Sequence, residues 1–248
     1  MRARRGVILG LLVLACLIGG LLYLVGVAAT DPVDRRRAFA IARMVTGLIL
    51  LWVGLGGGLM YRFRATIRAR VLPIRLNWRL KFVLFATTLA CLEEAVTVSM
   101  TNLAPVFGSR IGEAYITASA QYLDVIALHS VVVFIPLFIA LALLLGRYDF
   151  KPFAVFLAFG LVGTLVEAIF SGALATLLTF PLWVFVYGLM VWLPAFCLPQ
   201  NRSARPVGWL HHALFAPAIL LVAMPMILPV VYVITGILDH PSIDFDPP

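Results

Sequence analysis

Two adjacent carboxylates lie in the middle of an apolar stretch of this chain. Glu93 and Glu94 are followed at helical spacing by Thr97 and Thr101, with Asn102 directly after them. An ionised carboxylate in an apolar environment is costly unless protonation, a cation or a network of donors neutralises it. These residues are therefore the first candidates for a functional site.

Helix geometry separates the two acids. Adjacent side chains on a helix point about 100° apart, so Thr87, Glu94, Thr97 and Thr101 share one stripe and Glu93 is rotated away from it. We expect Glu94 to face a polar cavity and Glu93 to support it.

Two later segments carry similar polar residues. Gly160, Thr164, Glu167 and Ser171 fall on one stripe by the same spacing, and His129 follows Asp124 in the segment between them. We predict that Glu94, His129 and Glu167 converge on one cavity and form the catalytic or metal-binding set. The predicted supporting residues are Glu93, Thr97, Thr101, Asn102 and Ser171.

Three functions are compatible with this set. Carboxylates and imidazole can bind a divalent metal and activate water, which favours a membrane-embedded hydrolase acting on a lipid or another membrane substrate. The same acids could bind protons or cations in a coupled transporter. They could also hydrogen-bond three helices together in a non-catalytic scaffold or complex subunit. No HExxH spacing is present, so the sequence leaves the three open.

The composition indicates the medium that surrounds this site. Hydrophobic residues make up 63% of the 248, the mean hydropathy is +1.06 and only 12% are charged. Soluble domains are closer to half apolar and a quarter charged. The net charge of +8 comes mainly from arginines between the apolar runs, so we expect the lipid bilayer, and not nucleic acid, as the partner.

An apolar run needs about 20 residues to cross a bilayer. The runs of about this length in the sequence predict an all-α, seven-helix membrane bundle in which residues 1–248 form a single domain. The expected spans are approximately 7–29, 38–61, 82–105, 125–145, 153–177, 180–198 and 214–238.

Charges in the short loops predict the orientation. Arginine and lysine are enriched in residues 2–5 and 62–81, and the C-terminal tail is acidic, which places the N-terminus in the cytoplasm and the C-terminus outside. We expect a prokaryotic cytoplasmic membrane. Residues 62–81 are either a simple topogenic loop or an amphipathic segment on anionic lipid. His211 and His212 are interpreted as interfacial anchors, and His240 falls in the outer tail.

This topology predicts that reporters fused after Lys81 and after Asp239 lie on opposite sides of the membrane. A phosphatase that is active only outside the cytoplasm should be inactive after Lys81 and active after Asp239, with a fluorescent reporter giving the inverse result. Equal signals at the two positions would show that the number of spans between them is even.

Overall fold

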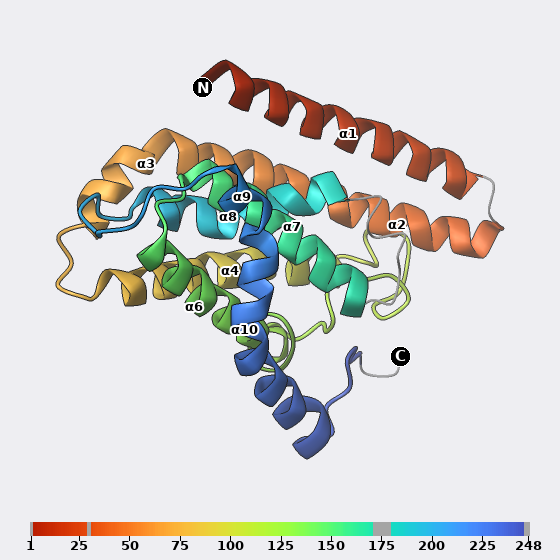
Figure 1. Cartoon of the computed structure of the whole chain (residues 1–248). Helices are drawn as coiled ribbons and strands as arrows, with labels where there is room; N and C mark the ends of the chain where they lie inside the picture. Colours follow the sequence, from red (N-terminus) through yellow and green to blue (C-terminus); the bar gives the residue numbers. More distant parts are fainter. Residues whose placement is uncertain (1, 29–30, 171–179, 246–248) are drawn as a thin grey trace.

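The protein is built of helices. The computed structural model describes residues 2–28, 31–170 and 180–245, and within them the only β-type pairing is two isolated bridges, Ser119 with Asp244 and Tyr148 with Arg205. The helices lie in a bundle that α1 borders on one side (Figure 1).

Four helical segments are long and apolar enough to cross a membrane. They are Gly6–Tyr23 within α1 (Arg2–Ala28), the continuous helix Pro32–Val71, α4 (Trp78–Asn102), and Phe215–Ile237. The continuous helix comprises α2 (Pro32–Leu48), the π-helical η1 (Ile49–Gly56) and α3 (Gly57–Val71); the last segment comprises α10 (Phe215–Tyr232) and the π-helical η4 (Val233–Ile237).

A fifth span is formed by a bent pair of helices. Tyr122–His129 and Val131–Arg147 meet at an angle of 49°. The first part contains α5 (Tyr122–Asp124) and the π-helical η2 (Val125–His129), and the second is α6 (Val131–Arg147). The described chain thus has four or five candidate membrane spans, and the predicted count of seven and the orientation stay predictions.

The remaining apolar helices are shorter. α7 (Pro152–Phe170) and α8 (Phe180–Phe196) fall where the fifth and sixth spans were expected, and α9 (Trp209–Ala213) precedes α10. The end of the expected fifth span, residues 171–177, and the expected link 178–179 lie outside the described residues. The helix that contains the second predicted span is longer than that span: it begins at Pro32, continues to Val71 and includes the first half of the basic segment 62–81.

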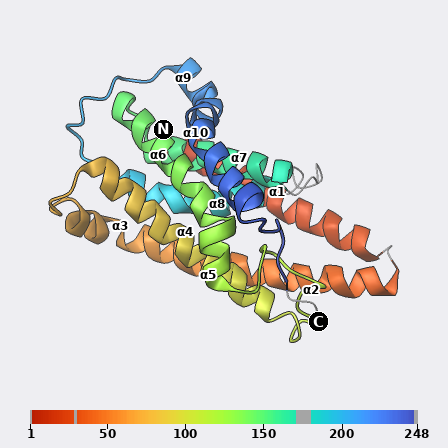
Figure 2. The same ribbon diagram turned by 90° about the horizontal axis from the view of Figure 1, so that it is seen from below.

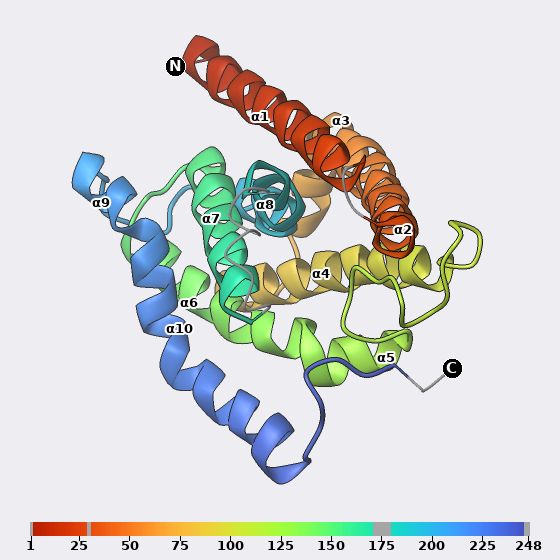
Figure 3. The ribbon, with the colours of Figure 1, turned by 90° about the vertical axis from the view of Figure 1, so that its right-hand side faces the viewer.

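α8 occupies the centre of the bundle. It contacts α1, α3, α4 and α7, and Figure 3 shows it almost end-on between α7 and α3. The core around it is apolar and includes the fully buried Phe138, Phe159, Leu137 and Met190. α8 therefore holds together helices that are distant in the sequence.

Glycines allow α7 and α8 to approach closely. A Cβ atom at Gly160 would lie 2.6 Å from Val184 Cα, and one at Gly163 would lie 2.2 Å from the Tyr187 ring. From the other side, a Cβ at Gly188 would lie 2.8 Å from the backbone oxygen of Phe156. Small residues at such positions let helices pack at backbone contact.

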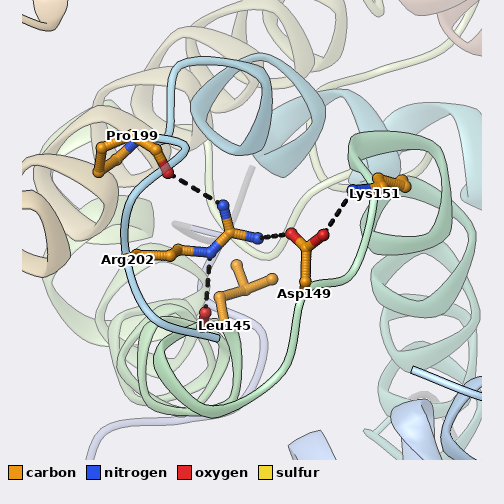
Figure 4. A network of polar contacts seen from close by, with 5 residues as sticks. All are labelled: Leu145, Asp149, Lys151, Pro199 and Arg202. Atoms are coloured by element: carbon orange, nitrogen blue, oxygen red, sulfur yellow. Dashed lines mark hydrogen bonds and ion pairs between the residues drawn. The ribbon is translucent and has the colours of Figure 1, made fainter. Parts of the chain in front are cut away.

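An ionic network closes one end of the bundle (Figure 4). Arg202 donates to the backbone oxygens of Leu145 and Pro199, both at 3.1 Å, and to Asp149 Oδ1 at 2.5 Å. Lys151 donates to Asp149 Oδ2 at 2.5 Å. The network joins the α6–α7 connection to the segment after α8. The hydrogen bond from Lys151 and the charge of Arg202 lower the pKa of Asp149 below its ordinary value.

The α7–α8 contact predicts a position-dependent effect of adding one methyl group. Gly160→Ala should destabilise the protein by about 1–3 kcal/mol, because the clash is with backbone atoms that cannot move aside cheaply. Thermal unfolding in detergent should show a midpoint several degrees lower. Gly58→Ala is the matched control, because a Cβ there meets nothing within 4 Å; an equal loss in both variants would contradict close packing as the cause.

The lowered pKa of Asp149 predicts acid sensitivity. A carboxyl group with a depressed folded-state pKa stabilises the protein above its unfolded value, about 3.9, and loses this contribution as the pH falls through the folded value. Wild type should therefore melt above Asp149→Asn at pH 7, and the difference should shrink below about pH 4. Asp34→Asn, at an exposed acid at the start of α2, is the control. A gap between wild type and Asp149→Asn that does not change with pH would rule out the carboxylate charge as its origin.

Candidate metal centre

The two acids that opened the sequence argument are both buried on α4. Glu93 is 3% exposed and Glu94 is 5% exposed. The Thr97 hydroxyl lies 2.9 Å from Glu94 Oε2 and 3.0 Å from the Glu94 backbone oxygen. The expected pairing of Glu94 with the threonine one turn later is therefore present.

Thr101 and Asn102, the next polar residues on α4, bind the loop that follows this helix. Thr101 is fully buried, and its hydroxyl accepts a hydrogen bond from the Ile116 backbone N–H at 3.2 Å. The Asn102 amide donates to the Ala120 backbone oxygen at 3.0 Å. Both residues fasten the α4–α5 connection to the end of α4, so in the structure they position a loop.

The α7 members of the predicted set cannot be placed. The side chain of Glu167, and Ser171 altogether, lie outside the described residues. Thr164, one turn before Glu167, is buried and donates to the Gly160 backbone oxygen at 2.9 Å. Convergence of Glu94 with Glu167 stays a prediction.

His129 lies in a cluster that the sequence indicated only weakly. Its Nε2 is 3.1 Å from Asp124 Oδ2 and 3.0 Å from His240 Nε2, and His240 Nε2 is 3.2 Å from Asp124 Oδ1. The three side chains are largely covered, at 6%, 12% and 14% exposure for His129, Asp124 and His240. One potential ligand atom from each lies within 4.8 Å of the others.

Local helix geometry brings the first two ligands together. Asp124 and His129 are five residues apart, and the chain between them is π-helical, with Ser130 N–H donating to the Val125 oxygen at 2.9 Å. This wider i→i+5 turn is rare and often occurs at functional sites. It turns His129 back toward Asp124 just before the bend into α6.

The third ligand arrives at the end of another π-helical turn. After η4, Asp239 adopts a left-handed conformation with φ of 50°, which Asp tolerates better than most residues. His240 N–H then donates to the Ile234 oxygen at 3.0 Å. This reversal directs the tail, and with it the His240 ring, toward η2.

The tail continues along the α4–α5 connection. Asp244 N–H donates to the Ala118 oxygen at 2.8 Å, and the Phe245 ring lies 4.7 Å from that of Tyr115. A cavity of about 20 Å³ between Asp244 and Ser119–Gln121 has room for a water molecule. The cluster is therefore framed by a tail that several independent contacts hold in place.

α5 also connects this cluster to the α4 acids. The Tyr122 hydroxyl, two residues before Asp124, donates to the Cys91 backbone oxygen at 2.9 Å. Cys91 precedes Glu94 by about one helical turn. The cluster and the glutamates thus lie on neighbouring elements.

The other two histidines form no comparable cluster within the described residues. His211 and His212 contact Gly208, and their rings lie 5.0 Å from Tyr148 and 5.5 Å from Phe150 respectively. These contacts hold α9 against the α6–α7 connection, and the expected role of the two histidines as interfacial anchors stays a prediction.

No match to this chain is found among protein-family models, curated proteins or solved structures. The functional argument therefore depends on the geometry of the site itself.

The sequence held a weak signal for this cluster. Asp124 and His129 were noted together, and the expected topology places His240 at the same outer end. Their spacing matches no helical repeat of 3 or 4 residues, and 111 positions separate the two histidines. Only the folded chain shows that they meet.

Proposed function

We propose that this protein is a multi-pass membrane protein with a divalent-metal centre formed by Asp124, His129 and His240. The observation that carries the proposal is the mutual contact of three potential ligand side chains. Each Nε2 has two neighbours within 3.2 Å, yet a ring nitrogen offers a single in-plane proton or lone pair. Well-directed hydrogen bonds cannot satisfy all three contacts, whereas one cation can.

The separations suit a first-row divalent ion. Such an ion is bound by His nitrogen and Asp oxygen at about 2.0–2.2 Å. The contacting pairs of ligand atoms, two of which use different oxygens of Asp124, are 3.0–3.2 Å apart. Taken singly, each pair would subtend roughly 90–105° at the ion, between octahedral and tetrahedral values. Two imidazoles and one carboxylate fit Zn²⁺, and they also fit Fe²⁺. We take Zn²⁺ as the expected ion because the set resembles that of zinc hydrolases with two histidines and one acid.

Three protein ligands leave a coordination position open. An ion bound in this way lowers the pKa of a bound water and polarises carbonyl or phosphoryl oxygens. This chemistry supports the hydrolase hypothesis with a different set of residues. The proposed metal ligands are His129, Asp124 and His240 instead of His129, Glu94 and Glu167. Asp124, His129 and His240 would hold the ion, and the ion would supply the activated water.

The apolar helices support membrane insertion. With four or five candidate spans, the substrate of such a centre would be a lipid or another molecule held in the bilayer. The buried Glu94–Thr97 pair on α4 is a second polar site near α5, and it favours proton uptake as an accompanying role.

Metal analysis tests the proposal directly. Purified wild type loaded with Zn²⁺ and then desalted should retain about one ion per chain. His240→Ala should lose most of it, because two remaining ligands bind far more weakly, and Asp124→Asn should lose it to a similar degree. His212→Ala removes one imidazole from the other end of α10 and should retain the metal.

Two results would contradict a metal centre. One is wild type without stoichiometric metal after loading, and the other is equal metal in wild type and His240→Ala. Circular dichroism of each variant in detergent should show unchanged helicity, which separates loss of ligand from loss of fold. Zinc-dependent hydrolysis of lipid substrates that disappears in His240→Ala would extend the result from binding to catalysis.

A further inference from the structure

The end of the bundle opposite the metal centre is strongly basic. Residues 62–81, here called the basic hairpin, contain seven arginines and lysines and no acid, and no Asp or Glu occurs between Asp34 and Glu93. Figures 1 and 2 show the α3–α4 connection at one end of the molecule, with α5 and the C-terminus toward the other. The basic surface lies away from the metal centre, and its charge does not depend on a bound metal.

The length of the second helix places this hairpin at the membrane surface. Pro32–Val71 has 40 residues and is therefore about 60 Å long, twice the hydrocarbon thickness of about 30 Å. Its uncharged stretch, residues 44–61, covers only about 27 Å. The last turns of α3 must extend beyond the hydrocarbon, into the region of the lipid headgroups.

The hairpin is held rigid from within. The Lys81 ammonium group donates to the backbone oxygens of Val71, Leu72 and Ile74 at 3.2, 3.0 and 3.1 Å. These carbonyls end α3, so Lys81 caps that helix. The Lys81 ammonium group is therefore bound within the protein, and its hydrogen bonds fix the shape of the hairpin without a ligand.

Three arginines of the hairpin are exposed and have no such partner. Arg62, Arg70 and Arg75 are exposed, and none of them forms an ion pair with any residue that the structure describes. The Arg79 guanidinium instead packs against α6, where a Cβ atom at Gly146 would lie 2.7 Å from its Nη2. By contrast, Arg202 on the neighbouring connection is bound by Asp149. The exposed guanidinium groups are therefore available to an external anion.

Apolar side chains are interspersed with these arginines. Leu72, Ile74 and Leu76 at the tip are 37%, 48% and 48% exposed. A segment that combines exposed leucine and isoleucine with arginine is suited to the boundary between headgroups and acyl chains. A free phosphate ion would use the arginines but not these apolar residues.

We propose that the basic hairpin binds the headgroups of anionic phospholipids in the leaflet on its side. Each guanidinium can donate two parallel hydrogen bonds to a phosphodiester, and Leu72, Ile74 and Leu76 contact the acyl chains below it. A charge that served only to orient the chain during insertion would require no such selectivity in the folded protein.

Lipid retention tests this proposal. Wild type is reconstituted in nanodiscs of phosphatidylcholine mixed with phosphatidylglycerol, and native mass spectrometry identifies the lipids that remain bound after release. Phosphatidylglycerol should be enriched several-fold over its share in the disc, and the midpoint of thermal unfolding should exceed that in phosphatidylcholine alone. Added inorganic phosphate should not displace the lipid.

The matched variants locate the effect. Arg70→Gln combined with Arg75→Gln should abolish the enrichment, while Arg36→Gln combined with Arg37→Gln makes the same charge change at the other end and should preserve it. The remaining hairpin charges keep the positive bias that orients the chain, and Arg75→Lys should give an intermediate result. Equal retention of both lipids by wild type, or equal losses in the two double variants, would overturn the proposal.

Discussion

Polar groups in this protein must find partners inside it, because apolar helices and lipid offer none. This constraint accounts for contacts in every part of the bundle. The Thr97 hydroxyl lies against the carboxylate of Glu94, Thr101 accepts from the backbone of the next loop, and Arg202 binds two carbonyls and a carboxylate. The Thr97–Glu94 contact lies within α4, whereas the contacts of Thr101 and Arg202 join a helix to a segment that follows later in the chain. Contacts that satisfy buried polar groups therefore also fix the tertiary arrangement of this protein.

The proposed metal centre is the place where hydrogen bonds alone do not meet this constraint. Asp124, His129 and His240 come from two segments that both end in π-helical turns, and each turn directs a ligand to the same point. The tail that carries His240 is also attached at Asp244 and Phe245. An ion would thus bind to a framework that is already assembled, which lowers the cost of ordering its ligands.

The two ends of the molecule differ in chemistry. One has the metal-ligand cluster and the acidic tail, and the other has the basic hairpin and the Asp149–Arg202 network. The apolar bundle between them is held by the close approach of α7 and α8 at Gly160, Gly163 and Gly188. The proposed metal site and the proposed lipid site therefore lie at separate ends of the bundle.

The sequence by itself determined the class of the protein. Long apolar runs specify helices that a bilayer can hold, and helical spacing correctly paired Glu94 with Thr97, because both depend only on local geometry. Local patterns failed where the helix departed from 3.6 residues per turn: the i→i+5 turn that pairs Asp124 with His129 has no signature in a search for i, i+3 and i+4 neighbours. No local sequence pattern predicts the contact between His129 and His240. It arises because α10 crosses the bundle and Asp239 reverses the chain, so only the tertiary structure decided which of the many polar residues share a site.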